Sequence, residues 1–192
     1  MPDANARRFR FNIGMRNVKT AVATTLCALL YFIFSAIIGE YRNPTFACIG
    51  AIFGTGSDVA NSKLNGGNRL WGTVFGGVIG MLLFPVYCLF YPDGERHFLL
   101  LVFLFLGTII LILTSLFFKW PGAIQPGGVV LCIILFTTPV ESYVSYALNR
   151  MLDTAIGVIL AIAIEYLFPR ERIIKILVKL KLRKPESFDF QD

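Results

Sequence analysis

Long apolar runs separated by short polar segments rich in glycine and proline make up most of this chain. An α-helix of about 20 apolar residues is long enough to cross the hydrocarbon core of a bilayer. The polar segments GEYRNP, YPDGERH and KWPGAIQPGG separate the runs from one another. We therefore predict an all-α integral membrane protein with six transmembrane helices. They are expected at about 18–38, 45–57, 69–90, 98–118, 129–138 and from about 142 or 149 to 168, and the second and fifth are short.

The polar stretch SDVANSKLNGGN follows the second apolar run. We expect the second helix either to fade into this stretch or to be broken by it. The third helix is therefore predicted to begin near Arg69, where the chain becomes apolar again.

Composition supports the membrane assignment. Hydrophobic residues make up 56% of the chain and charged residues only 16%, whereas soluble domains have roughly 45–50% and about 25%. A soluble protein of this length would leave several such runs exposed to water.

The distribution of Lys and Arg predicts the orientation. If the N-terminus is cytoplasmic, only Arg42, Arg96 and Arg150 fall outside, which leaves 15 of the 18 basic residues on cytoplasmic segments. This asymmetry fits the positive-inside rule with both termini cytoplasmic and an even number of spans. We expect a multi-pass protein of the cell membrane, and the net charge of +6 then does not indicate nucleic acid.

We divide the chain into a basic N-terminal segment (1–16), a transmembrane domain (17–168) and a cytoplasmic tail (169–192). The tail sequence RERIIKILVKLKLRK places most of its isoleucines and leucines on one helical face. A basic amphipathic helix of this kind prefers the membrane surface. It either anchors the sixth helix or binds a partner.

Residues that could support metal or covalent chemistry are few. The four cysteines all lie inside apolar runs, and the sequence contains no CxxC motif and no Cys/His cluster. A buried free cysteine usually behaves as a small hydrophobe. We expect no metal and no cofactor, and without a nucleophile–base set we expect no enzyme.

A short internal repeat relates the two halves. The segment NRLWGTVFGGVIG (68–80) aligns with NRMLDTAIGVILA (149–161) at an offset of 81, with identical Asn, Arg, Thr and Gly. Inverted repeats are a recurrent plan of transporters, so we predict two inverted three-helix repeats, about 17–91 and 98–168. Arg69 then opens a helix at the cytoplasmic mouth and Arg150 opens one at the outer mouth. Alternatively, Asn-Arg simply begins a membrane helix in each half, with the arginine at the headgroups.

Small residues recur at helical spacing. Because lipid provides no hydrophobic drive between helices, small residues let backbones approach closely. We assign a packing role to Gly50, Gly54, Gly72, Gly76, Gly80 and Gly157.

One face of the sixth helix combines small and acidic residues. Asp153, Gly157, Ala161 and Glu165 recur every four residues. An aspartate at the bilayer centre costs about 2.5–3.5 kcal/mol on insertion scales, so this face is predicted to turn inward. Arg150 lies near enough to pair with Asp153 at i, i+3. In the first helix, Lys19 offers another interior cation, on a face that continues through Ala23 and Cys27.

At these residues the sequence resembles the aromatic acid exporter and fusaric-acid-resistance-like (FUSC) membrane proteins, over about residues 12–168. The resemblance is carried by IGMRNVKTAVA, NPTFACIGAIFGTGS, NRLWGTVFGGVIG and NRMLDTAIGVILAIAIEYLFP. It implies a six-helix membrane domain of two halves, commonly paired into larger assemblies, that exports aromatic carboxylic acids; related plant proteins conduct organic anions. Two departures are that many relatives carry a large cytosolic domain after the membrane part, and that Glu165 stands where an asparagine is expected.

We therefore predict a membrane transporter that exports aromatic or other organic carboxylic acids. Lys19 and Arg69 would compensate the substrate carboxylate from the inside and Arg150 from the outside, with Thr73 and Thr154 beside them. Asp153 or Glu165 would carry an exchanged proton, because low dielectric disfavours an ionised carboxyl group. The alternatives are a passive organic-anion channel and a non-transporting assembly subunit. The expected partners are the lipid bilayer, a small organic anion and further copies of the chain, as a homodimer or higher homo-oligomer.

Overall fold

The computed structural model describes residues 15–95, 97–169 and 172, and every regular element in this part of the chain is a helix. The predicted all-α class is confirmed. The predicted N-terminal segment 1–16 and the amphipathic tail 169–192 lie almost wholly outside the described residues. The elements are α1 (Met15–Ile38), α2 (Thr45–Gly54), α3 (Val59–Cys88), α4 (Leu99–Phe117), the 3₁₀ turn η1 (Pro121–Ala123), α5 (Ile124–Thr137) and α6 (Tyr143–Leu167).

Four of these helices, α1, α3, α4 and α6, are long and apolar enough to cross a membrane. The predicted second and fifth helices are indeed short, since α2 has 10 residues and α5 has 14. At a rise of 1.5 Å per residue, α2 spans about 15 Å, which is about half the thickness of a hydrocarbon core. Neither short helix can cross a bilayer alone.

The start of α3 differs from the prediction. The helix begins at Val59, ten residues before Arg69, so the polar stretch SDVANSKLNGGN forms its first turns. Asp58 caps this start, because its side chain accepts a hydrogen bond from the backbone N–H of Asn61 at 2.8 Å, satisfying one of the unpaired donors at a helix N-terminus. α6 begins at Tyr143, so of the two predicted starts of the sixth helix the one near 142 is confirmed. The Asn-Arg pairs therefore lie inside both helices. The prediction that they open the helices is wrong.

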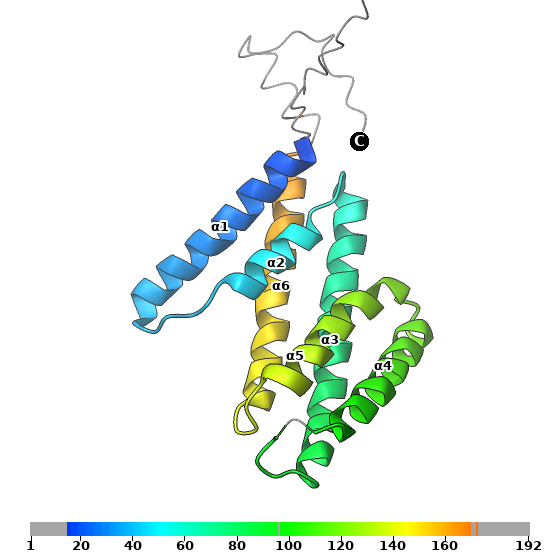
Figure 1. Ribbon diagram of the computed structural model, residues 1–192. Coiled ribbons are helices and arrows are strands. Elements are labelled where there is room, and N and C mark those ends of the chain that lie inside the picture. The colour runs from blue at the N-terminus through cyan, green and yellow to red at the C-terminus, as the bar shows by residue number, and fades with distance from the viewer. Residues whose placement is uncertain (1–14, 96, 170–171, 173–192) are drawn as a thin grey trace, which may run out of the picture.

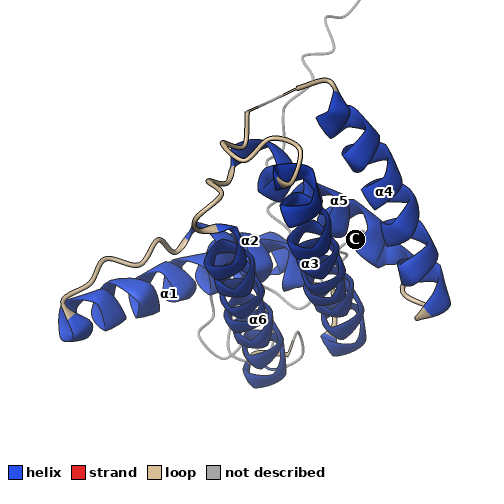
Figure 2. Ribbon diagram, turned by 90° about the horizontal axis from the view of Figure 1, so that it is seen from below, coloured by secondary structure: helices blue, strands red, loops and turns tan. Residues whose placement is uncertain are grey.

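The helices are arranged around two central ones (Figure 1). α3 and α6 run along the middle of the molecule, α2 crosses α6, and α5 crosses α3. α1 and α4 flank this centre on opposite sides, as the view in Figure 2 shows. The beginning of α1, the beginning of α3 and the end of α6 all lie at the same end of the molecule.

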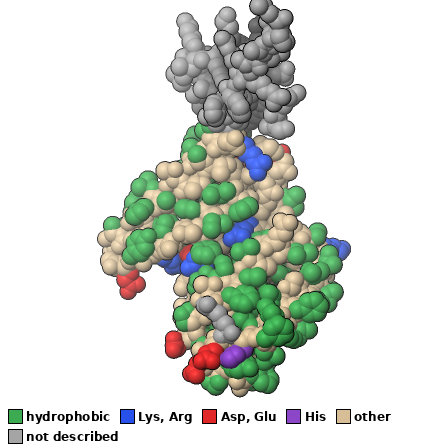
Figure 3. All heavy atoms as spheres, viewed as in Figure 1, with side chains coloured by type: hydrophobic (Ala, Val, Ile, Leu, Met, Phe, Trp, Pro, Cys, Tyr) green, Lys and Arg blue, Asp and Glu red, His purple; other side chains and the backbone are tan. Residues whose placement is uncertain are grey.

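Two hydrophobic cores hold this arrangement. One lies among α3, α4 and α5 and includes Phe84, Leu111 and Leu131; the other lies among α1, α2 and α6 and includes Cys27 and Ala51. Outside the cores, large hydrophobic side chains are exposed along α1 and α4, and hydrophobic surface spreads over much of the face seen in Figure 3. Such surface is suited to lipid.

The two crossings depend on glycine. A Cβ at Gly157 of α6 would overlap the backbone of Ala47 and Ala51 in α2, and a Cβ at Gly76 of α3 would overlap the backbone of Gly127 in α5. Each crossing is therefore a backbone-to-backbone contact that a larger residue would push apart. The remaining glycines assigned to packing also lie against another helix: Gly50 and Gly54 against α6, and Gly72 and Gly80 against η1 and α5.

Candidate functional site

A cavity of about 580 Å³ lies where α2, α3 and α5 meet, beside the start of α1. Polar side chains line one part of it, and apolar and aromatic side chains line the rest. A pocket of this size is in the range that binds small molecules. Its lining consists of Arg16, Ile52, Phe53, Asn65, Asn68, Arg69, Gly122, Gln125, Pro126 and Val129.

Two arginines line this cavity, the exposed Arg16 and the buried Arg69. Arg69 is only 7% exposed, and its Nε is buried with no hydrogen-bond partner among the described residues. No described carboxylate pairs with it, and its guanidinium lies 5.6 Å from the centroid of the Phe53 ring. A buried charge without a counter-ion is costly. The site is therefore suited to bind an anion.

The other groups in the cavity define what kind of anion fits. Asn65 lies three residues before Asn68 and four before Arg69, so it neighbours both on the surface of α3. All three residues line the cavity. Gln125 adds a third amide from α5. A guanidinium binds a carboxylate in a bidentate manner, while the Phe53 ring offers a surface for an apolar body. The cavity thus matches a small carboxylate that has an apolar or aromatic part.

The two predicted threonines are buried but lie outside the residues that line this cavity. The hydroxyl of Thr73 donates to the carbonyl oxygen of Arg69 at 2.9 Å, within its own helix. The hydroxyl of Thr154 is buried without a partner among the described residues, on the part of α6 that packs against Gly50.

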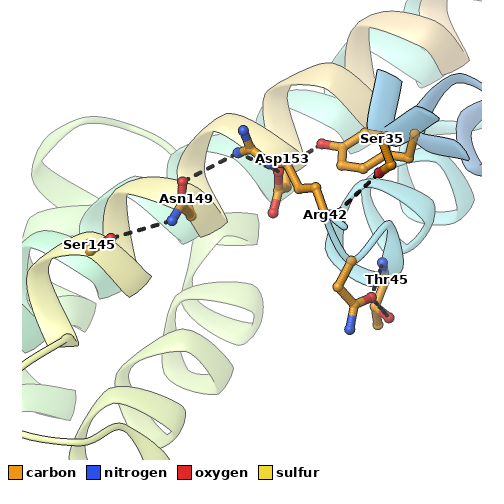
Figure 4. A network of polar contacts seen from close by, with 8 residues as sticks. Ser35, Arg42, Thr45, Ser145, Asn149 and Asp153 are labelled. Carbon is orange, nitrogen blue, oxygen red and sulfur yellow. Dashed lines mark hydrogen bonds and ion pairs between the residues drawn. The ribbon is translucent and has the colours of Figure 1, made fainter. Parts of the chain in front are cut away.

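Asp153 is bound by residues from two other parts of the chain, α1 and the loop that follows it, and Figure 4 shows its contact with Arg42 of this loop. Its Oδ1 accepts hydrogen bonds from the hydroxyl of Tyr31 at 2.7 Å and from Arg42 Nη2 and Nε at 2.9 and 3.2 Å. Arg42 Nη2 also donates to Oδ1 of Asn149 at 3.3 Å. We call these four residues the Asp153 cluster. The predicted partner of Asp153 was Arg150, and this prediction is wrong, because Arg42 from the α1–α2 loop pairs with it instead.

Arg150 stacks on aromatic rings. Its guanidinium carbon lies 3.7 Å from the centroid of Phe46 in α2 and 4.6 Å from that of Tyr146, one turn earlier in α6. Its Nε and Nη1 are buried with no hydrogen-bond partner among the described residues. Cation–π contacts of this kind stabilise a desolvated guanidinium. They also draw it away from Asp153.

Lys19 pairs with Glu165 at 2.6 Å, and both side chains are at most 5% exposed. The charge of Lys19 is therefore compensated within the protein, and Lys19 does not line the Arg69 cavity. The two polar contacts between α1 and α6 are twelve residues apart on each helix, from 19 to 31 and from 153 to 165. Between them lie Ala23 and Cys27 on α1, so the interface has charged or polar ends and a middle of small residues.

Sequence reasoning found the charges but missed most of their neighbours. Tyr31 could have been found, since it continues the four-residue spacing of Lys19, Ala23 and Cys27. Arg42 carried a weaker signal, namely that it falls on the same predicted outer side as Arg150. Nothing in the sequence pointed to Gln125 or Phe53, because they reach Arg69 only through the crossing of three helices. Among the described residues no group of three His, Cys, Asp or Glu side chains could hold a metal ion.

In the described part of the chain every regular element is a helix, four helices are long and apolar enough to span a membrane, and charged side chains are buried among them. These are features of a membrane protein. The family model described as aromatic acid exporter family member 1 matches residues 11–168, so this chain belongs to the aromatic acid exporter family. This confirms the family resemblance drawn from the sequence. Membership indicates a membrane transporter rather than an enzyme. A search of curated proteins found no match, and a search of solved structures found none either.

Proposed function

We propose that the protein exports small organic carboxylic acids, aromatic ones in particular, and that Arg69 binds the substrate carboxylate in the cavity among α2, α3 and α5. The observation that carries this proposal is the buried guanidinium, which has no counter-ion among the described residues and faces a cavity with amide and aromatic neighbours. A substrate carboxylate would supply the missing charge, and its ring would pack on Phe53.

The same proposal includes two inverted three-helix repeats, about 17–91 and 98–168, with six membrane-inserted helices and both termini cytoplasmic in the cell membrane. The packing of the short helices supports the repeats, because each short helix crosses a long helix of the other half. α2 of the first half crosses α6 of the second, and α5 of the second half crosses α3 of the first. The glycines at these crossings, Gly76 and Gly157, are 81 residues apart, as are Arg69 and Arg150. On this arrangement α2 and α5 enter the membrane only part of the way. We further propose a homodimer or higher homo-oligomer, as the family resemblance implies.

A path for the substrate runs along α2. Arg69 packs on Phe53 near the end of α2, and Arg150 packs on Phe46 near its beginning. Seven residues separate the two phenylalanines, which corresponds to about 10 Å along a helix. The carboxylate would pass from Arg69, on the cytoplasmic side, to Arg150, on the outer side. We leave Lys19 out of this path because Glu165 neutralises it.

Proton exchange would involve one of the two carboxyl groups of α6. Glu165 faces Lys19 of α1, and its Oε2 has no hydrogen-bond partner among the described residues. Asp153 faces Tyr31 and Cys27 of α1, Arg42 of the following loop and Asn149 of its own helix. Flux of an aromatic acid that depends on a proton gradient, and loses this dependence in Glu165→Gln or Asp153→Asn, would support coupling. Flux that ignores the gradient in the wild type would oppose it.

Ligand-dependent thermal stability tests the binding site. Purified protein would be heated with benzoate, with neutral benzamide and with cationic benzylamine. Stabilisation by a ligand follows RT ln(1 + [L]/Kd), so benzoate should raise the Tm progressively, and benzamide and benzylamine should not. Arg69→Gln should greatly reduce the response to benzoate, whereas Lys63→Gln, a change of an exposed charge on the same helix, should preserve it. Equal responses to benzoate and benzamide would contradict the proposal.

A passive anion channel is the second candidate. The observation that favours it is that Asp153 and Glu165 are both ion-paired, which leaves no free carboxyl group among the described interior residues for a carrier cycle. Single-channel currents recorded in a planar bilayer would favour this function. Slow flux that saturates with substrate concentration would favour the transporter.

A further inference from the structure

The hydrogen bonds of the Asp153 cluster converge on one atom. The Tyr31 hydroxyl and two nitrogens of Arg42 all donate to Oδ1 of Asp153, within 2.7–3.2 Å. Hydrogen bonds from a guanidinium to a carboxylate oxygen are charge-assisted and stronger than neutral ones, so Arg42 and Tyr31 together form a donor set that can bind a carboxylate. In this structure the carboxylate that they bind is that of Asp153.

A cavity of about 210 Å³ adjoins this site. It is lined by Leu30, Tyr31, Phe34, Arg42 and Ile156, so two of the residues that bind Asp153 also face the cavity. The remaining lining is apolar and aromatic. The Arg42 side chain is 35% exposed, whereas that of Asp153 is only 2% exposed.

The position of this cavity separates it from the Arg69 cavity. Arg16, near the start of α1, lines the Arg69 cavity, whereas Tyr31 and Phe34 lie near the other end of the same helix and Arg42 lies in the loop after it. No residue lines both cavities.

We propose that Tyr31 and Arg42 form a second carboxylate-binding site, which Asp153 occupies as an internal substitute for a ligand. The ligand would be a small monocarboxylate with an apolar or single-ring body, its carboxylate on Arg42 and Tyr31 and its body against Leu30, Phe34 and Ile156. This inference goes beyond the proposed function, because it assigns a different site and does not depend on Arg69.

The affinity of this site for a carboxylate ligand depends on the balance of charges. When a ligand carboxylate replaces Asp153, Arg42 stays paired, so the guanidinium is not left without a counter-ion. Asp153, which is only 2% exposed, would lose three donors in the exchange, and this cost keeps the site closed to weak ligands. Removing the Asp153 carboxylate should therefore open the site.

The test measures benzoate binding by calorimetry in a background that lacks the first site. In Arg69→Gln, benzoate should bind weakly. Adding Asp153→Ala should strengthen benzoate binding at least tenfold, and adding Arg42→Gln to that double variant should remove the gain. Benzamide, which has the same shape without the charge, should show no gain in any variant. Leu30→Trp, which fills the cavity, should reduce the gain for benzoate more than for formate.

Two results would overturn the proposal. One is benzoate binding to Arg69→Gln/Asp153→Ala that is no tighter than binding to Arg69→Gln alone. The other is an equal gain for benzamide. If Asp153→Ala does not fold, Asp153→Asn preserves the shape of the side chain while removing its charge and serves the same comparison. The proposed function is judged separately, by whether Arg69→Gln weakens benzoate binding when Asp153 is intact.

Discussion

The segments 68–80 of α3 and 149–161 of α6 align in sequence, but the two helices hold their neighbouring helices by different forces. At the offset of 81, Arg69 corresponds to Arg150 and Gly76 to Gly157, whereas Gly72 corresponds to Asp153. Glu165 of α6 corresponds to Phe84 of α3 by the same offset. The first copy thus has a glycine and a phenylalanine where the second copy has two carboxylates.

This difference decides how the flanking helices attach. α4 packs on α3 through an apolar core that contains Phe84 and Leu111. α1 is tied to α6 by the Lys19–Glu165 ion pair at one end and by the contact of Tyr31 with Asp153 at the other. Apolar packing is non-directional and tolerant of small shifts, whereas a buried ion pair is either formed or broken at high cost. The comparison indicates that a change of charge can alter the attachment of α1 to α6, but not the attachment of α4 to α3.

The largest expected effect comes from breaking the Lys19–Glu165 pair. Glu165→Gln would leave the Lys19 ammonium buried without a counter-ion, and we expect a loss of about 3–5 kcal/mol in the free energy of unfolding. The double variant Lys19→Met/Glu165→Met makes this contact apolar, like the contact between α3 and α4. It should restore most of the lost stability. Equilibrium unfolding in mixed detergent measures both. A double variant as unstable as the single one would show that the pair is not what attaches α1.

The next effect tests the feature that the two copies share. Gly76→Ala and Gly157→Ala each place a Cβ against the backbone of the crossing helix, and overpacking of this kind costs about 1–3 kcal/mol. We expect similar losses of Tm for both variants. Gly128→Ala is the matched control, because a Cβ there meets nothing within 4 Å. A large loss at only one of the two glycines would break the equivalence of the crossings.

A smaller effect should distinguish the two arginines. Arg150 lies 3.7 Å from the centroid of Phe46, whereas Arg69 lies 5.6 Å from that of Phe53. Cation–π contacts contribute about 0.5–2 kcal/mol, so Phe46→Leu should destabilise the protein more than Phe53→Leu. A double-mutant cycle with Arg150→Met isolates the contact. Equal coupling for both pairs would mean that the two guanidiniums have the same surroundings.

The smallest effect concerns how the two helices begin. Asp58 caps α3, whereas Ser142 makes no side-chain cap bond to α6. The hydrogen bond from the Asn61 backbone N–H is the main reason why the pKa of Asp58 lies below its usual value of 3.8. The cap therefore stabilises the protein above pH 3.8, and this contribution disappears as the pH falls through the lower folded-state pKa. Asp58→Ala should lower the Tm slightly at pH 7 and not at strongly acidic pH. Ser142→Ala should change the Tm at neither pH.

The all-helical class and the four span-capable helices could be predicted from the sequence, because apolar runs of bilayer length are typical of transmembrane helices. The start of α3 could not, since its first turns are polar. Their helical form depends on the Asp58 cap and on contacts such as that of Gly66 with Val158 of α6. A reading based on hydropathy cannot see such contacts between distant segments.

The candidate site divides in the same way. The sequence drew attention to Arg69, Asp153 and Glu165, because a charge inside an apolar run is unusual. It could not give their surroundings, which depend on how the helices cross. Arg150 illustrates this, since spacing favoured an i, i+3 pair with Asp153 whereas the α2 crossing brought Phe46 to Arg150. Only the three-dimensional structure shows that Arg69 is buried beside a cavity and has no carboxylate partner among the described residues.

The most direct test of this account is the flux of benzoate from proteoliposomes that contain the wild-type protein, Arg69→Gln or the control Lys63→Gln. The account predicts saturable benzoate flux in the wild type and the control, and at least a tenfold loss in Arg69→Gln, with all three proteins equally folded. Benzoate flux in Arg69→Gln equal to that of the wild type would contradict the central claim that the substrate carboxylate binds at Arg69.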